Sequence, residues 1–209
     1  MLRTAIVSLG LALLGGSSAA WLTEGFEVWT AEGARRLAVM RRPVNVPAVV
    51  LEGPGMTGHD LHDVLTSDGR TTIAAFVYTR CTSVCSVLGS TFQQLQRTLG
   101  MNGYDGVQLL SISFDPEHDD AAHLDQYAAR WGADPLRWRV ATAPRHDDLE
   151  RLLRAFRVVV VPDGLGGFEH NAALLVIDAQ GRLVRIFDDT ELDAALAYAR
   201  SLERRGAAV

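Results

Sequence analysis

The stretch Phe76–Cys85, FVYTRCTSVC, decides the fold because it joins a buried strand to a helix and holds both cysteines of the chain, Cys81 and Cys85. It continues an apolar run, Thr71–Tyr78, of the kind found in strands buried on both faces. Beyond it, apolar residues recur every three to four positions, as in an amphipathic helix: Val84, Leu88, Phe92, Leu95 and Leu99. We therefore predict a strand–loop–helix unit with the two thiols at its junction.

The position of the thiols favours sulfur chemistry. A helix N-terminus offers free N–H groups and a partial positive charge, which stabilise a thiolate and make it a better nucleophile and metal ligand. Cysteines four residues apart lie on one helix face, close enough to form a disulfide or to hold one metal ion. The Cys-x-x-x-Cys spacing differs from the Cys-x-x-Cys of dedicated oxidoreductases, so a thioredoxin-type redox reaction is less favoured. A structural disulfide or two buried apolar cysteines are the plainer alternatives, although a bridge over so short a loop stabilises little.

Length and composition are those of one globular domain with an N-terminal extension. The chain has 209 residues, 48% of them hydrophobic, which is enough to build a full core. The formal net charge of −5 provides no basic surface for nucleic acid, so we expect no nucleic-acid partner.

The N-terminus predicts export. A positive charge at Arg3 is followed by an apolar segment, Ala5–Leu14, and by small residues that suit signal-peptidase cleavage after Ala20. The uncharged span is also nearly long enough to cross a bilayer as a retained anchor. Both alternatives place the protein in the periplasm or on the outer face of the cytoplasmic membrane, where thiols oxidise unless a reductant acts on them. We predict a signal peptide or membrane anchor over 1–22, a linker arm over 23–47 and a globular domain over 48–205.

From residue 71 onward, strand and helix patterns alternate. Apolar runs and helical spacing predict strands at 71–78, 107–114 and 139–142, helices at 83–99, 121–131 and 146–156, a hairpin at 172–178 and 182–187, and a last helix at 189–202. This order predicts an α/β fold, with a thioredoxin-like central mixed sheet and helices on both faces. Ligands of such sheets bind beyond the carboxyl ends of the strands, where the cysteines would lie.

One of the six histidines is a candidate third ligand. His170 lies between a Gly/Pro-rich loop, Pro162–Gly167, and an apolar strand, Ala172–Ile177, whose entry packs near the cysteine helix in a thioredoxin-like fold. Two thiolates and one imidazole suit Cu(I) and also hold Cu(II), whereas a structural zinc site usually needs a fourth ligand. The other histidines lie in polar or acidic surroundings, which predict a solvated surface role: His59, His62, His118, His123 and His146.

Three motifs in the order found here resemble the Sco/SenC family of exported, thioredoxin-like copper proteins that help to assemble cytochrome c oxidase. They are YTRCTSVC at Tyr78–Cys85, SFDPEHD at Ser113–Asp119 and FEHNAALLVIDAQG at Phe168–Gly181. The resemblance covers roughly Gly53 to Leu202, and the combination of motifs is more specific than any one of them.

The resemblance implies a ligand set and partners. Cys81, Cys85 and His170 would bind one copper ion per chain, as Cu(I) or Cu(II), and the two cysteines would form a redox-active disulfide pair. The implied partners are the CuA site of cytochrome c oxidase subunit II, a copper donor protein or thiol reductant, and the membrane if the N-terminus is retained. Thiol–disulfide exchange that keeps the cysteines of the subunit reduced is the other implied role. Asp115, in the matching Asp-Pro, either supports the site or the partner surface, or only forms a turn at a strand end.

The chain departs from the family at two positions. Many relatives carry Cys-Pro-x-x-Cys-Pro, whereas Thr82 and Ser86 replace the prolines here. We expect this change to loosen the loop and to alter its redox potential or copper affinity. A metallochaperone without turnover chemistry is the preferred hypothesis, and a metal-free thiol–disulfide oxidoreductase acting on partner cysteines is the second. A peroxiredoxin-like peroxidase is the third, and it is disfavoured because no proline precedes Cys81 in the nearby loop to shape a peroxide pocket.

Overall fold

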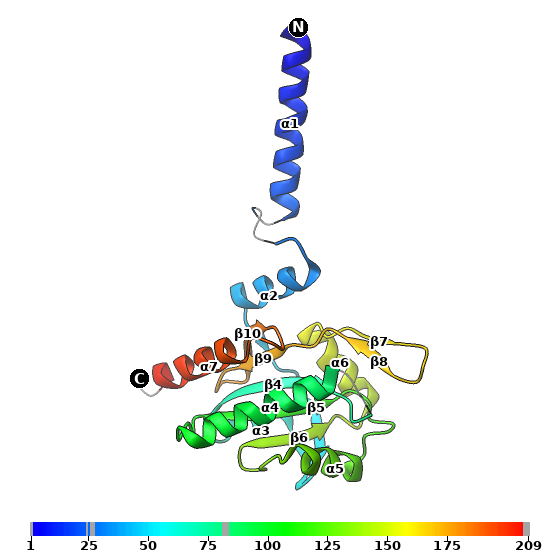
Figure 1. Cartoon of the computed structure of the whole chain (residues 1–209), viewed down its shortest axis with the longest axis vertical. Coiled ribbons are helices and arrows are strands. Elements are labelled where there is room, and N and C mark those ends of the chain that lie inside the picture. Colours follow the sequence, from blue (N-terminus) through cyan, green and yellow to red (C-terminus); the bar gives the residue numbers. More distant parts are fainter. Residues whose placement is uncertain (1, 24, 26–27, 81–83, 207–209) are drawn as a thin grey trace. The chain divides into compact units, whose positions relative to one another are not determined.

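The elements of the chain follow the predicted alternation of strands and helices (Figure 1). The structure is a computed structural model that describes residues 2–23, 25, 28–80 and 84–206. In order, the elements are α1 Leu2–Leu22, α2 Ala31–Arg41, β1 Val44–Asn45, β2 Val50–Gly53, β3 Met56–Asp60, α3 Leu61–Thr66, β4 Thr71–Val77, α4 Val84–Met101, β5 Val107–Ser113, α5 Ala121–Trp131, β6 Trp138–Thr142, α6 His146–Phe156, β7 Val160–Pro162, β8 Phe168–His170, β9 Leu174–Ile177, β10 Arg182–Phe187 and α7 Leu192–Gly206. They form two compact units, Met1–Ala38 and Val39–Val209.

The N-terminal unit is dominated by α1, a helix of 21 residues. Its large aliphatic side chains are exposed, among them Ile6, Leu9, Leu11, Leu13 and Leu14. Within the part of the chain that the structure describes, no helix combines the length and the apolarity that crossing a membrane requires. The signal or anchor over 1–22 therefore stays a prediction from the sequence.

The larger unit is built on one mixed sheet of eight strands in the order β1-β10-β9-β4-β5-β6-β2-β3. Strands β4, β5 and β6 run parallel, and the remaining neighbours pair antiparallel. Every residue of β4 and β5 is buried, including polar ones such as Thr72, Gln108 and Ser111, and their largely apolar sequences reflect burial on both faces. The short strand β1 pairs with β10, so the sheet begins within the segment 23–47 that the sequence predicts to be a linker arm.

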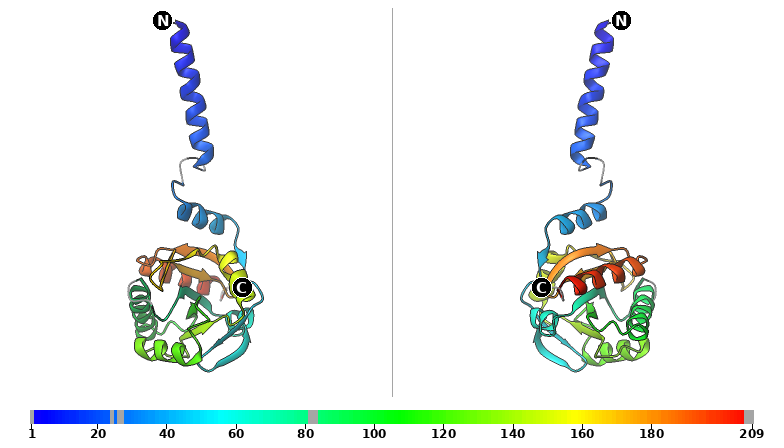
Figure 2. Two further views of the ribbon diagram at one scale, coloured as in Figure 1. Left: turned by 90° about the vertical axis from the view of Figure 1, so that its right-hand side faces the viewer. Right: turned by 90° about the vertical axis from the view of Figure 1, so that its left-hand side faces the viewer.

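Helices cover both faces of this sheet, as predicted (Figure 2). On one face, Phe92 of α4 packs against Trp138 of β6, with 5.5 Å between the ring centroids. On the other face, Phe156 of α6 contacts the edge of Phe76 of β4, with 5.9 Å between centroids. The buried aromatic and aliphatic side chains form one continuous core between these layers.

Helix α3 is an element that the sequence pattern does not predict. It spans Leu61–Thr66 and contains His62, while the neighbouring His59 lies in β3. The carboxylate of Asp60 accepts a hydrogen bond from the N–H of His62 at 2.8 Å and so caps the helix start. Leu61 and Leu65 are fully buried, which shows that tertiary packing stabilises a helix of only six residues.

Candidate metal centre

Residues 78–83, called the cysteine loop below, lie in the sequence between β4 and α4, which confirm the predicted strand and helix on either side. Cys81 lies outside the described residues. Cys85 belongs to the first turn of α4, and its side chain also lies outside the described part. The structure therefore describes the approach to the thiols, through Tyr78, Thr79 and Arg80, rather than the positions of the sulfurs.

Thr79, two residues before Cys81, is held by the buried carboxylate of Asp119. The backbone N–H of Thr79 donates to Oδ2 at 2.9 Å, and its hydroxyl donates to Oδ1 at 2.6 Å. Ser113, the last residue of β5, donates a third hydrogen bond to Oδ2 at 2.5 Å. Because Asp119 is fully buried, these charge-assisted bonds replace the water that its carboxylate loses. The start of the cysteine loop is thereby tied to the end of β5.

Arg80, the residue before Cys81, is fixed by a second buried carboxylate. Its guanidinium donates to Oδ2 of Asp115 at 2.8 Å, and Oδ1 of Asp115 lies 2.9 Å from Nδ1 of His118. The hydrogen bond to Asp115 raises the pKa of Arg80, which stays cationic next to the first cysteine of the chain. The backbone carbonyl of Asp115 also accepts the N–H groups of His118 and Asp119, so this residue both supports the loop and forms the turn.

The hairpin β7–β8 carries His170. The sequence shows this segment only as a Gly/Pro-rich loop, but its strands pair antiparallel, with Val160 opposite His170. The carboxylate of Asp163 accepts hydrogen bonds from the N–H groups of Leu165 and Gly167, at 2.7 and 2.9 Å, and so closes the turn. His170 is therefore placed by a defined strand and not by an irregular loop.

Tyr78 links the cysteine loop to this hairpin. Its hydroxyl lies 3.3 Å from the carbonyl oxygen of Phe168, to which it donates, and 3.2 Å from the backbone nitrogen of Phe168, from which it accepts. The ring of Phe114 packs against both Tyr78 and His170. Its centroid lies 5.3 Å from that of the Tyr78 ring and 5.0 Å from that of the His170 ring. One aromatic ring thus contacts both the third residue before Cys81 and the candidate ligand on β8.

The imidazole of His170 is suited to metal binding because its surroundings favour the neutral ring. Burial lowers the pKa of His170 below its ordinary value of 6.5. We expect NMR titration of the reduced, metal-free protein to give a midpoint below 6.5, which returns to about 6.5 when urea unfolds the chain. Because protonation is penalised only in the folded state, the free energy of unfolding should fall as the pH decreases from 6.5 through the folded-state pKa. A midpoint above 6.5 in the folded protein would contradict a desolvated ring.

The other five histidines are exposed, as predicted. His123 pairs with Asp120 at 2.8 Å and His146 with Glu150 at 3.1 Å, both on helix surfaces. His118 differs because it shares Asp115 with Arg80, a role that the sequence pattern did not reveal. The pattern also missed Thr79, Arg80 and Asp119. Their nearness to the cysteines and to the SFDPEHD motif was visible, but the bonds between them depend on the parallel pairing of β4 with β5.

Among the side chains that the structure describes, no three from His, Cys, Asp and Glu are grouped to hold a metal ion. The side chains of Cys81 and Cys85 lie outside that part, so the ligand set of Cys81, Cys85 and His170 stays a prediction. Its donor atoms fit copper, since two soft sulfurs and one imidazole suit Cu(I) and also hold Cu(II).

A mixed sheet with helices on both faces, and a cysteine pair where a central strand leads into a helix, defines this chain as a thioredoxin-like α/β protein. Comparison with known families narrows the class, because the model of the family described as SCO1/SenC matches residues 59–204. The chain belongs to the SCO1/SenC family.

Known relatives agree with this assignment. The chain is 25% identical over 125 residues to the SCO1 protein homolog of Bacillus subtilis (strain 168), a match that spans 59% of this chain and 64% of the relative. The structure of BsSco, a member of the Sco family of cytochrome c oxidase assembly proteins in which a disulfide switch was identified, matches with a TM-score of 0.66 at 19% identity, over 77% of this chain and 94% of that chain. ScoI of Bradyrhizobium japonicum, solved with copper bound, matches with a TM-score of 0.62 at 22% identity, over 76% and 99%. These similarities confirm the predicted fold.

Proposed function

We propose that this chain is an exported copper protein of cytochrome c oxidase assembly, located in the periplasm or on the outer face of the cytoplasmic membrane. It delivers copper to the CuA site of subunit II or keeps the cysteines of that site reduced. Cys81, Cys85 and His170 are the proposed ligands of one copper ion. The observation that carries the proposal is the link through Tyr78, which ties the strand of His170 to the approach to Cys81. The copper in ScoI of Bradyrhizobium japonicum supports the choice of metal.

The residues of the chain would both hold the ion and control its release. The start of α4 and the charge of Arg80 favour the thiolate forms of the cysteines, which are the forms that bind metal. Burial keeps His170 neutral, so its ring nitrogen has a lone pair for the ion. Oxidation of the thiols of Cys81 and Cys85 to one disulfide passes two electrons and two protons to a partner disulfide, which becomes a dithiol, and it removes both sulfur ligands. The redox state of the pair therefore determines whether copper binds.

Copper titration of the reduced full-length chain, purified in detergent, tests the proposal. We expect saturation at one ion per chain, with sulfur-to-copper charge-transfer absorption and an EPR signal for the Cu(II) form. The matched control is the same preparation oxidised to the disulfide, which should bind no stoichiometric copper. Equal binding by the reduced and oxidised chains would remove the cysteines from the site.

A thiol–disulfide oxidoreductase that acts on partner cysteines without a bound metal is the second candidate. A cation held directly before Cys81 favours it, because a positive neighbour stabilises the attacking thiolate. The disulfide switch identified in BsSco agrees with redox activity in a relative. This function predicts a reduction potential poised for exchange with glutathione, and reductase activity that His170→Ala retains. If the reductase activity were lost when copper is removed, the copper-binding function would be favoured over the metal-free oxidoreductase.

A further inference from the structure

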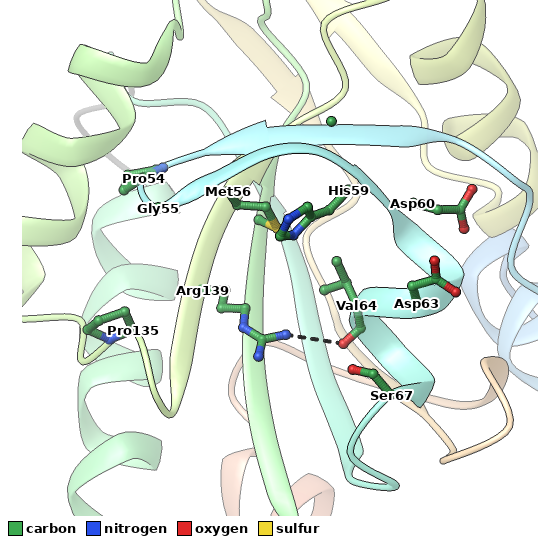
Figure 3. Close-up of a pocket in the computed structure, with 11 residues that line it drawn as sticks. Pro54, Gly55, Met56, His59, Asp60, Asp63, Val64, Ser67, Pro135 and Arg139 are labelled. Carbon is green, nitrogen blue, oxygen red and sulfur yellow. Dashed lines mark hydrogen bonds between the residues drawn. The ribbon is translucent and has the colours of Figure 1, made fainter.

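A cavity with polar and apolar lining lies away from the cysteine loop, beneath the β2–β3 hairpin (Figure 3). Its volume is about 540 Å³, and it is lined by the hairpin, by α3 and by the start of β6. Strands β4, β5 and β6 run parallel, and the cysteine loop follows the carboxyl end of β4. Arg139 of this cavity lies near the opposite, amino-terminal end of β6, and Pro135 precedes that strand. The proposed copper ligands and the residues that fix the cysteine loop take no part in its lining.

A β-bulge makes His59 line this cavity together with Met56. In a regular strand, residues three apart point to opposite faces. The pairing of β2 with β3 shifts register between Leu51 and Gly53, and Gly58 has a positive φ of 68°. Both side chains therefore line the same cavity, and Figure 3 shows the His59 ring beneath the hairpin. Bulges of this kind re-aim a side chain and are common next to functional sites.

Arg139 supplies a fixed cation on the opposite wall. Its Nη1 donates to the carbonyl oxygen of Val64 at 3.2 Å, which holds the guanidinium across the cavity (Figure 3). Asp68, at the same end of the sheet, accepts a hydrogen bond from Arg70 at 2.7 Å, and the more distant charge of Arg139 also helps to lower the pKa of Asp68. Within the described part of the chain, no carboxylate forms an ion pair with Arg139. A guanidinium carries five N–H donors, so most of the donors of Arg139 face water or a ligand.

Asp60 and Asp63 add two carboxylates to the wall formed by the start of α3. The Asp60 carboxylate accepts one hydrogen bond, from the N–H of His62, and Asp63 is exposed. The cavity is therefore divided by charge, with a guanidinium on the β6 side and carboxylates on the α3 side. A purely anionic ligand would meet Asp60 and Asp63, and a purely cationic one would meet Arg139.

We propose that this cavity binds a small zwitterion, a free amino acid or a short peptide, whose carboxylate pairs with Arg139 and whose ammonium group pairs with Asp63 and Asp60. The volume lies in the range of sites that hold small molecules. His59 offers a further hydrogen-bonding group at the mouth. This site shares no residue with the proposed copper site, so the failure of one proposal would not affect the other.

NMR titration of the ¹⁵N-labelled full-length chain with three matched probes tests the assignment. Glycylglycine carries both charges, N-acetylglycine only the carboxylate, and glycinamide only the ammonium group. We expect glycylglycine to shift the amide signals of Gly58, His59 and Asp63 with saturation. Each singly charged probe should bind at least about tenfold more weakly, because it lacks one charge-assisted pair. Equal affinity for all three probes, or shifts that never saturate with glycylglycine, would overturn the proposal.

Matched variants locate the two charges. Arg139→Gln and Asp63→Asn should each weaken glycylglycine binding at least about tenfold. Arg137→Gln and Asp125→Asn, which change a nearby guanidinium and an exposed carboxylate outside the cavity, should leave it unchanged. Asp63→Asn is less disruptive to folding than Arg139→Gln, because Asp63 is exposed. Wild-type affinity of this variant for glycylglycine would show that Asp63 does not bind the ammonium group. Copper titration of the same variants should give the wild-type stoichiometry, which keeps this result separate from the metal site.

Discussion

Replacing Cys81 or Cys85 by serine is expected to abolish stoichiometric copper binding. A serine hydroxyl is a hard, neutral donor, whereas Cu(I) prefers soft thiolate ligands. Loss of an outer-shell partner of a metal site typically costs about 10–100-fold in affinity, and loss of a direct thiolate ligand should exceed that range. Competition against a chromophoric Cu(I) chelator measures the effect, with the reduced full-length chain as reference.

Histidine variants provide the matched comparison for this experiment. His170→Ala should weaken copper binding and change the EPR parameters of the Cu(II) form, because one nitrogen ligand is lost. His146→Ala removes an exposed imidazole that pairs with Glu150 on the surface of α6, so this variant should bind copper as the wild type does. Wild-type affinity in His170→Ala would remove His170 from the ligand set and leave thiol–disulfide exchange as the supported function.

Asp119→Asn is expected to destabilise the protein by about 3 kcal/mol, because the amide presents a donor where Thr79 and Ser113 also donate, and unpaired buried donors are costly. Urea unfolding of the reduced, metal-free chain measures the change in free energy. The same substitution releases the start of the cysteine loop from β5. We therefore expect copper affinity to fall by about 10–100-fold, as on loss of an outer-shell partner.

The adjacent residue supplies the control. Asp120 is exposed and caps α5 by accepting the N–H of His123 at 3.0 Å. Asparagine is as good an N-cap as aspartate, so Asp120→Asn should change stability by no more than about 0.5 kcal/mol and leave copper affinity unaltered. Equal effects of the two substitutions would show that the bonds of Asp119 to Thr79 contribute nothing beyond the loss of one negative charge.

Most of the sheet and its long helices could be predicted from the sequence, because burial of these elements produces a recognisable pattern of apolar residues. Strands β4 and β5 are buried on both faces and are rich in apolar residues, and the one apolar face of α4 gives a helical period. Helix α3 and the hairpin β7–β8 show no such pattern. Helix α3 is short, and its buried leucines are separated by polar residues such as His62 and Asp63. In the hairpin, each strand has only three residues and the turn is rich in glycine.

The metal ligands of the candidate site could be proposed from the sequence, but the residues that hold the cysteine loop in place could not. The spacing of the cysteines and the place of His170 before an apolar strand pointed to a soft metal. Nothing in the residues HDD at 118–120 distinguishes Asp119, which is buried, from Asp120, which is exposed. That difference arises only when β5 pairs beside β4 and brings Ser113 next to the turn that follows Val77.

The hydrogen bonds between Thr79 and Asp119 also bear on how this chain tolerates Thr82 and Ser86 where many relatives carry proline. A proline ring limits the conformational freedom of a loop through its own backbone, whereas here a buried anion restrains the loop from outside. The start of the cysteine loop thus depends on a side-chain contact, which one substitution can remove. The same aspartate change should be milder in a relative that keeps its prolines, so the tolerance of this position depends on the background in which it is tested.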